Sequence, residues 1–482
     1  MEALLRPITA TEILSHEAPL RVGMISLGCA KNLVDAEVML GDIVRQGMEV
    51  TGNAEEADVL IVNTCAFIDS AKEESIEAIL EAHQKRGLRR RQGQKIIVSG
   101  CMSQRFSSEL AHEMPEVDAF MGLDQIAEAG AIVRRVARNE SSGARPLNLV
   151  TPKSRYIPDY ATPRFRLTPS HFTYVKIAEG CNHPCSFCVI PQMRGRHRSR
   201  SMESVEAEIR HLVEEGVKEF NLISQDTTYY GMDLWDQKAG PRQPVDSTRG
   251  PTLTRLLERI DAIPGEFWVR LLYTHPAHWS SELIRAVAAS PKVAKYIDMP
   301  LQHIHQEMLG LMRRETSREH IEELIQSIRE GIPGVTLRTT FIVGFPGETE
   351  DHFSALTEFI ERARFERLGI FTYSREEGSR AARMANHVPG ATKARRYRRA
   401  MELQQRIAGE HATKMVGQEI KALVEQPLIA RSEADAPEVD TRILLSSPAP
   451  VGEFLKVRVT GTQTYDLRGD PLNAKIHPAP AG

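Results

Sequence analysis

Short apolar, β-branched segments alternate with helix-forming segments along most of this chain, and this alternation limits the folds that it can adopt. The first block occupies residues 21–137, and its strand segments are RVGMISLGC, DVLIVNTC and QKIIVSGC. Continuous apolar runs of this length are typical of strands buried on both faces of a parallel sheet. Because strands and helices alternate, we expect an N-terminal α/β domain with a parallel sheet.

A second block of strand and helix segments covers residues 171–390. Six strand segments, from FTYVKIAEG to RLGIFTYS, are separated by helical patterns. Six strand–helix units fall short of the eight that close a barrel. We therefore expect a partial, TIM-like (βα)6 barrel.

The remaining stretches complete the expected multidomain α/β organisation. Residues 1–20 are an N-terminal tail, and residues 138–170 are a proline-rich linker. Residues 391–412 form a basic connecting helix. In residues 413–482 apolar and polar side chains alternate, which predicts a small antiparallel β-barrel.

The composition excludes several classes of protein. Six cysteines in 482 residues are too few for a disulfide-rich scaffold, and a net charge of −3 argues against a nucleic-acid coat protein. No apolar run approaches the roughly 18 residues of a membrane span, and the first twenty residues do not resemble a signal peptide. We therefore expect a cytoplasmic protein with reduced thiols and no membrane partner.

Cys181, Cys185 and Cys188 form a CxxxCxxC motif after the first strand of the second block. Active sites of α/β folds lie at the carboxyl ends of parallel strands, where this motif falls. Three thiolates can ligate three irons of a 4Fe–4S cluster and leave the fourth open to a chelating ligand such as S-adenosylmethionine. The alternative is a zinc site with His183 as fourth ligand, although Pro184 and the tight spacing make that tetrahedron awkward.

The other cysteines, Cys29, Cys65 and Cys101, are spaced 36 residues apart, and each follows a strand of the first block. Successive parallel strands bring their carboxyl ends to one edge of a sheet, so we expect these thiols to converge. Loop amides and helix N-termini at that edge favour thiolates. A second cluster with an open iron could hold a sulfur group for transfer to a substrate. The alternative is that each of the three cysteines is only a small buried hydrophobic residue.

The CxxxCxxC motif, with an aromatic residue before its last cysteine and a six-unit partial barrel after it, resembles the radical S-adenosylmethionine superfamily. The resemblance implies that a reduced cluster cleaves S-adenosylmethionine to a 5′-deoxyadenosyl radical, which takes hydrogen from an unactivated C–H bond. The segment FIVGFPGETED resembles the glycine-rich segment that lies near the cofactor in this superfamily. The alternative is an ordinary glycine–proline turn before a helix N-cap. The expected cofactor-binding residues are Phe187, Gln225, Gly344, Gly347 and Glu348.

The order of the domains resembles the methylthiotransferases over residues 21–476. That family has a cluster-binding N-terminal domain, a radical domain and a C-terminal β-barrel called TRAM. It implies S-adenosylmethionine and two 4Fe–4S clusters as cofactors, with no catalytic side chain beyond the cluster ligands identified. The implied ligands are Cys29, Cys65 and Cys101 for an auxiliary cluster and Cys181, Cys185 and Cys188 for the radical cluster.

Two segments, SLGCAKNLVDAE and RTTFIVGFPGETE, resemble the branch of this family that modifies a ribosomal protein. That branch methylthiolates the β-carbon of an aspartate in small-subunit protein S-twelve. The implied partners are this protein, an electron donor such as flavodoxin or ferredoxin, and a sulfur donor. The alternatives are the same chemistry on a tRNA adenosine, a non-catalytic iron–sulfur carrier, and a zinc-stabilised binding module.

The charge of the C-terminal segment bears on the partner. Residues 413–482 contain eight basic and nine acidic side chains, which is nearly neutral. A barrel that binds tRNA phosphates would be clearly basic, so this balance favours a basic protein partner. The alternative is that the barrel only covers the active site.

Two further sets of side chains have more than one interpretation. His303 and His305, after the fourth strand, are either proton carriers or structural histidines. A group of arginines after the first triad either binds a carboxylate of cofactor or substrate, or forms ion pairs within the barrel. These are Arg194, Arg196, Arg198 and Arg200.

Overall fold

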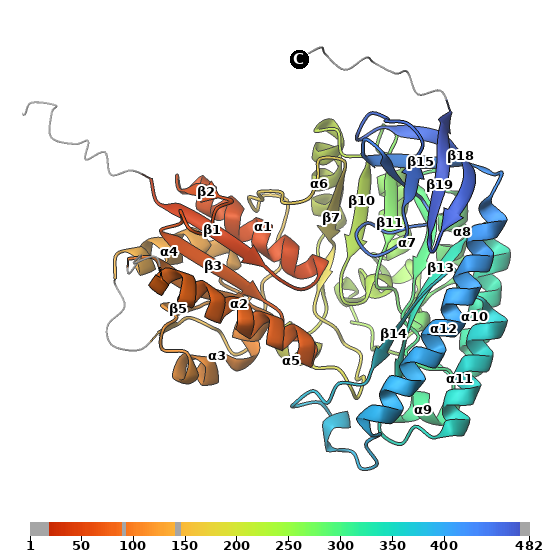
Figure 1. Cartoon of the computed structure of the whole chain (residues 1–482), viewed down its shortest axis with the longest axis horizontal. Helices are drawn as coiled ribbons and strands as arrows, with labels where there is room; N and C mark the ends of the chain where they lie inside the picture. Colours follow the sequence, from red (N-terminus) through yellow and green to blue (C-terminus); the bar gives the residue numbers. More distant parts are fainter. Residues whose placement is uncertain (1–18, 89–92, 140–145, 473–482) are drawn as a thin grey trace, which may run out of the picture.

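The computed structural model of the chain describes residues 19–88, 93–139 and 146–472. They form an N-terminal α/β domain, a central partial barrel and a C-terminal closed β-barrel, which confirms the expected fold class (Figure 1). The expected N-terminal tail lies outside the described residues except for its last two. Among the helices of the described residues, none combines the length and apolar character that crossing a bilayer requires.

The N-terminal domain is built on a parallel sheet with strand order β2-β1-β3-β4-β5-β6. Alternate residues of its central strands enter two separate apolar cores, one on each face of the sheet. The strands are β1 (Arg21–Ser26), β2 (Glu49–Thr51), β3 (Val59–Thr64), β4 (Lys95–Gly100), β5 (Ala119–Phe120) and β6 (Leu147–Asn148). The helices are α1 (Ala30–Arg45), α2 (Asp69–Leu88), α3 (Cys101–Glu113) and α4 (Ala129–Ala137).

The stretch 138–170, expected as a linker, is partly built into this sheet. Its strand β6 pairs in parallel with β5, and the backbone N–H of Leu149 donates to the carbonyl of Phe120 at 2.9 Å. Two residues are too short to show a strand pattern in the sequence. The later part of the stretch runs as a strap along α1, where Phe165 N–H donates to the Glu37 carbonyl at 2.9 Å.

The central domain is an open sheet of six parallel strands with order β14-β13-β12-β11-β10-β7. They are β7 (Phe172–Lys176), β10 (Glu219–Ile223), β11 (Trp268–Leu271), β12 (Val293–Asp298), β13 (Thr336–Val343) and β14 (Arg367–Thr372). A short antiparallel pair, β8 (Ala178–Glu179) and β9 (Arg198–Ser199), flanks the loop that carries the CxxxCxxC motif.

The helices of the central domain follow from their amphipathic sequences and their caps. They are α5 (Ile190–Met193), α6 (Met202–Glu214), α7 (Leu253–Asp261), α8 (Ser281–Ala289), α9 (Gln306–Leu311), α10 (Arg318–Gly331) and α11 (Glu350–Ala363). Five of them begin after a hydroxyl side chain that accepts a backbone N–H of the first turn, a strongly stabilising N-cap. These caps are Ser201, Thr252, Ser280, Ser317 and Thr349.

Helix α12 (Gly390–Met415) leads into the C-terminal barrel, which closes in the order β15-β16-β17-β19-β18. Its strands are β15 (Glu419–Gln426), β16 (Ile429–Ser432), β17 (Ile443–Leu445), β18 (Phe454–Gln463) and β19 (Asp466–Leu472). Strand β16 was not expected, because its four residues do not alternate clearly.

The acidic loop between β16 and β17, residues 433–442, docks against the strands of the partial barrel. Glu438 accepts from the hydroxyl of Tyr174 at 2.8 Å, and Asp440 accepts from Tyr296 at 2.6 Å. Asp435 pairs with Arg367 at 2.5 Å. The charge balance of residues 413–482 includes these three acids, which face the central domain, and Lys475, which lies outside the described residues. The near-neutral total therefore does not describe the outer surface of the barrel and does not indicate its partner.

Candidate functional site

Cys29, Cys65 and Cys101 meet at the carboxyl edge of the N-terminal sheet. Cys29 is the N-cap of α1, Cys65 follows β3, and Cys101 begins α3 directly after β4. Because β1, β3 and β4 are adjacent, the thiols are close enough for their charges to raise one another's pKa. A Cβ on Gly28, where φ is +92°, would lie 2.8 Å from Cβ of Cys65, so this loop requires glycine.

The three thiols differ in their surroundings. Cys65 and Cys101 are buried, and burial raises the pKa of both, to about 12 for Cys101. Cys29 is exposed. Desolvation opposes its ionisation, but the charges of Lys31 and Arg194 outweigh it and lower the pKa of Cys29. Metal ligation removes thiol protons, so buried thiols with raised pKa values are compatible with a metal-bound state. The exposure of Cys29 leaves space on that side for an additional ligand.

Cys181, Cys185 and Cys188 lie in the loop after β8. Burial raises the pKa of Cys188 to about 12 and raises that of Cys181 well above its ordinary value, and the neighbouring thiolates of the triad add to both shifts. The loop is anchored by Ser186, whose N–H and hydroxyl donate to the carbonyls of Met312 and Leu311. Three sulfur donors without a fourth fit an iron–sulfur cluster with one open iron.

His183 lies within this loop, and its ring contacts two carboxylates. Its Nε2 is 2.7 Å from Asp226 Oδ2, and its Nδ1 is 3.1 Å from Glu315 Oε2. Burial disfavours the charged ring, but these hydrogen bonds outweigh it and raise the pKa of His183 to about 10. Both ring nitrogens are therefore occupied by carboxylates, which argues against the zinc site with His183 as a ligand.

Two histidines that the sequence did not single out join this group. His278 Nδ1 is 2.9 Å from Asp226 Oδ2, and the His275 ring stacks on His183 with centroids 3.8 Å apart. Both are buried and come from the loop after β11. The His-x-x-His spacing in the sequence could have marked these two residues as candidates. The spacing alone, however, does not predict that they contact a cysteine loop about ninety residues earlier.

The expected cofactor-binding residues lie at the carboxyl ends of several strands. Gln225, after β10, donates from Nε2 to Glu179 Oε1 at 2.7 Å. Phe187, within the cysteine loop, packs in an apolar cluster with Phe345 and Tyr373. Contact of these side chains with S-adenosylmethionine stays a prediction.

Gly344, Gly347 and Glu348 follow β13 and have contacts within the protein. Glu348 is buried, accepts from the N–H of Gly344 at 2.5 Å and pairs with Arg396 of α12 at 2.7 Å. A Cβ on Gly344, where φ is +74°, would lie 2.3 Å from Cγ of Lys393, so α12 can pack here only against glycine. Their role in cofactor binding also stays a prediction.

His303 and His305 have structural contacts. The Nδ1 atom of His303 accepts the backbone N–H groups of Ile304 and His305. His305 is the N-cap of α9 and accepts from the N–H of Glu307 at 3.3 Å. These contacts favour the structural interpretation of both side chains.

Arg194, close in sequence to the CxxxCxxC motif, contacts the other cysteine triad. It lies six residues after Cys188, and its guanidinium donates to Cys101 Sγ at 3.2 Å, to Glu179 at 3.0 Å and to Asp35 of α1 at 3.0 Å. Lys176 completes the buried network by pairing with Asp35 and Glu179. Arg200 pairs with Glu208 at 2.5 Å, and Arg198 donates to backbone carbonyls. Three of the four arginines therefore make internal contacts.

Replacing Arg194 by methionine is expected to destabilise the docked domains by about 3–5 kcal/mol. The change leaves two buried carboxylates with one lysine between them, and unpaired buried charge is costly. The measurement is the urea midpoint of unfolding under anaerobic conditions. Arg210, which forms an exposed pair with Glu206, is the matched control, and its methionine variant should unfold near the wild-type midpoint. Equal midpoints for both variants would contradict the importance of the network.

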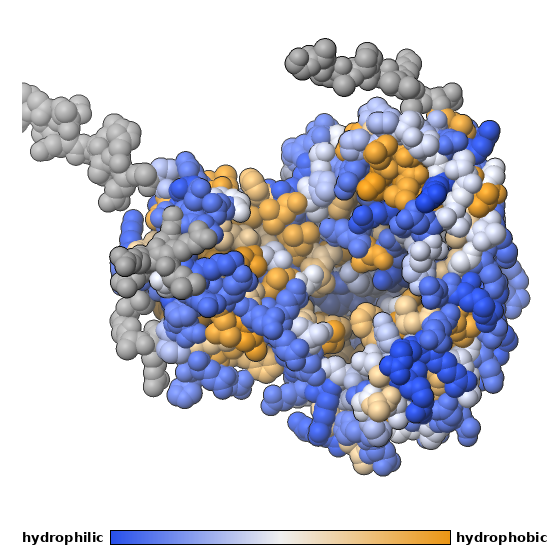
Figure 2. All heavy atoms as spheres, viewed as in Figure 1, coloured by the Kyte–Doolittle hydropathy of each residue, from blue (hydrophilic) through white to orange (hydrophobic). Residues whose placement is uncertain are grey.

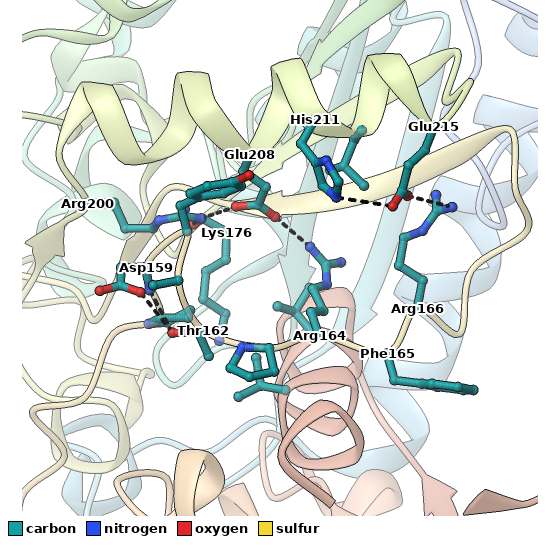
Figure 3. A pocket seen from close by; sticks show the side chains of 17 residues that line it. Asp159, Thr162, Arg164, Phe165, Arg166, Lys176, Arg200, Glu208, His211 and Glu215 are labelled. Atoms are coloured by element: carbon teal, nitrogen blue, oxygen red, sulfur yellow. Dashed lines mark hydrogen bonds and ion pairs between the residues drawn. The ribbon is translucent and has the colours of Figure 1, made fainter. Parts of the chain in front are cut away.

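A cavity of about 520 Å³ lies away from both triads, between the strap, α1 and α6 (Figure 3). Its charged side chains pair with one another: Arg164 with Glu208 at 2.9 Å, and Arg166 with Glu215 at 3.3 Å. These pairs attach the strap to α6. Because these charged side chains pair with one another, we interpret the cavity as a space between packed segments and not as a ligand-binding site.

Models of protein families match three parts of the chain. The Uncharacterized protein family UPF0004 matches residues 21–122, the Radical SAM superfamily matches residues 175–360, and the TRAM domain matches residues 416–472. A solved structure of the radical S-adenosylmethionine methyltransferase TsrM from Kitasatospora setae covers 73% of each chain with a TM-score of 0.51 at 15% identity, which supports the fold alone.

Curated relatives match nearly the whole chain. The protein named ribosomal protein uS12 methylthiotransferase RimO from Opitutus terrae is 58% identical over 95% of this chain and 98% of its own length. The protein of the same name from Akkermansia muciniphila is 52% identical over 94% of this chain and all of its own length. This chain therefore belongs to the RimO family of methylthiotransferases and is a radical S-adenosylmethionine enzyme.

Proposed function

We propose that this enzyme methylthiolates the β-carbon of an aspartate in ribosomal protein uS12. The observation that carries the proposal is the presence of two separate thiol triads, with Arg194 of the central domain donating to Cys101 of the N-terminal triad across the junction between the domains. Bound there, two 4Fe–4S clusters and S-adenosylmethionine supply a carbon-centred radical and a transferable sulfur. Close relatives named for action on uS12 support the choice of substrate.

We assign the six cysteines to two clusters. Cys181, Cys185 and Cys188 hold the radical cluster, and the auxiliary cluster is held by Cys29, Cys65 and Cys101. The protein's own contribution is to hold both loops in fixed positions, through the backbone N–H of Ser186 at the first triad and through Arg194 at the second. Phe187, Gln225, Gly344, Gly347 and Glu348 are the proposed contacts of S-adenosylmethionine.

The domain limits follow from this assignment. Residues 21–137 are the cluster-binding domain and residues 171–390 the radical domain, with residues 138–170 as a linker whose strand β6 adds to the sheet of the first domain. Residues 391–412 connect to the TRAM domain, residues 413–482. The reaction needs an electron donor, such as flavodoxin or ferredoxin, and a sulfur donor, and a ribosomal substrate places the enzyme in the cytoplasm.

The test of this function is the mass of uS12 from cells with and without the protein. We expect uS12 from the deletion strain to lack one methylthio group, and expression of the wild-type chain to restore it. Fragmentation of the protein should locate the group on an aspartate. An unchanged uS12 mass would contradict the proposal and direct attention to modified tRNA adenosines instead.

A further inference from the structure

Lys31 is a buried lysine of the described chain for which no carboxylate partner is found. It lies two residues after Cys29 in the first turn of α1, and its side chain is only 8% exposed. Among the described residues, no hydrogen bond or ion pair involves its ammonium group. Its Nζ instead lies 3.0 Å from the centroid of the Tyr273 ring. A buried ammonium in this state is costly unless an anion completes its environment.

The carboxylates near Lys31 already have other partners. The Cys29 thiolate is the anion that acts most strongly on the ammonium, followed by the carboxylates of Glu179 and Asp298. Glu179, however, pairs with Arg194 and Lys176. Asp298 accepts from Arg338 at 3.1 Å and from the backbone N–H of Tyr273 at 3.0 Å. The protein's carboxylates therefore leave Lys31, which faces the Cys29 thiolate, without a carboxylate partner of its own and available to one from outside.

Tyr273 holds Lys31 at the mouth of the barrel. The backbone of Tyr273 has φ +60°, which is uncommon for a bulky residue. Such strained backbone conformations often occur at functional sites. Two hydrogen bonds maintain it, from its N–H to Asp298 and from Thr227 N–H to its carbonyl. Thr227 follows Asp226, which binds His183 of the CxxxCxxC loop. Lys31 therefore lies beside Cys29, and its neighbour Tyr273 is connected through Thr227 and Asp226 to the CxxxCxxC loop.

The surface leaves an approach to this place. Cys29 and Gly28, beside Lys31, are exposed, whereas the other two thiols of their triad are buried. Figure 2 shows the molecule hollowed between the N-terminal domain and the barrels. An anionic side chain that enters from the open side of Cys29 would meet the ammonium first.

We propose that Lys31 binds the side-chain carboxylate of the substrate aspartate and so selects an acidic residue for modification. The inference rests on the proposed function, because it takes uS12 as the substrate. A carboxylate held by Lys31 keeps the adjacent β-carbon beside Cys29 and the auxiliary triad. The rival role for Lys31 is to balance the charge of the auxiliary site without touching the substrate.

The test compares uS12 carrying aspartate or asparagine at the modified position, since asparagine has the same shape without the charge. Affinities for the anaerobically reconstituted enzyme are measured by fluorescence anisotropy of labelled uS12. We expect the wild type to prefer the aspartate form by roughly tenfold or more, as is typical of a hydrogen bond to a charged group. The variant Lys31→Gln should bind both forms equally, and Lys31→Arg should retain part of the preference.

The matched control is Lys393→Gln. Lys393 also lies over a tyrosine ring, 4.9 Å from the centroid of Tyr373, but its ammonium donates to a backbone carbonyl at 2.7 Å. This variant should keep the full preference for aspartate. Iron content is measured for Lys31→Gln in parallel, so that loss of carboxylate binding is distinguished from loss of the auxiliary cluster.

The other outcomes overturn the proposal in distinguishable ways. If Lys31→Gln keeps the preference for aspartate, Lys31 does not bind the carboxylate, and a loss of iron in that variant would assign it to the auxiliary site. If the wild type binds both forms equally yet modifies the aspartate, this inference fails while the proposed function stands. If the wild type binds neither form, the proposed function fails together with the inference.

Discussion

Replacing Cys185 by alanine will abolish the cleavage of S-adenosylmethionine to 5′-deoxyadenosine. The remaining thiols of the loop, Cys181 and Cys188, cannot hold three irons of a cluster. Loss of hydrogen-bonded neighbours of metal ligands alone typically costs about 10- to 100-fold, so loss of a ligand should cost more. The measurement is 5′-deoxyadenosine formed per chain with dithionite as reductant, together with iron content, which should fall by half.

Ser186→Ala is the matched control for this variant. Ser186 is the next residue in the same loop, and its hydroxyl donates only to the carbonyl of Leu311, at 2.8 Å. Loss of that bond should leave the iron content intact and most of the cleavage activity. Cleavage at the wild-type rate by Cys185→Ala would refute the assignment of the radical cluster to this loop.

Replacing Cys65 by alanine will separate the two halves of the reaction. S-adenosylmethionine cleavage should continue, because the CxxxCxxC loop is anchored by contacts that do not involve Cys65. Formation of methylthiolated uS12 should fall below detection, because the auxiliary triad loses a ligand. The measurement is 5′-deoxyadenosine and the mass of uS12 in the same reaction mixture.

The retained cleavage activity also shows that the Cys65 variant is folded. Ser103→Ala is a suitable control, because Ser103 is buried two residues after Cys101 and its hydroxyl has no partner among the described residues. That variant should yield normal product. Methylthiolated uS12 from Cys65→Ala would mean that the N-terminal triad is not the source of the sulfur.

The fold could be predicted from the sequence where its signals are local. The six strands of the partial barrel are short apolar runs between amphipathic helices, and the structure has each of them within a few residues of the expected position. The nine-residue helix α4 was also missed; the other missed elements include β2, β5, β6, β16 and α9, which have two to six residues each. Segments this short do not complete a helical or strand period, so packing decides their conformation.

The candidate site likewise has features that the sequence predicts and contacts that it does not. The sequence predicts that Cys29, Cys65 and Cys101 converge, because equal spacing on successive parallel strands leads to one sheet edge. It does not predict that Arg194 donates to Cys101, a residue 93 positions away and in another domain. Charge counts failed similarly for the C-terminal barrel, because composition does not reveal that Asp435 and Asp440 face the central domain.

The sequence by itself determined the α/β class of the fold and the two groups of three thiols. Periodicity and spacing act within one strand–helix unit or between neighbouring units, so they can be read along the chain. Only the tertiary structure decided which buried charges are satisfied: Arg194 between Asp35 and Glu179, and Lys31 beside Tyr273 without a carboxylate. Those contacts depend on how the domains dock, and docking is set by surfaces assembled from residues far apart in the sequence.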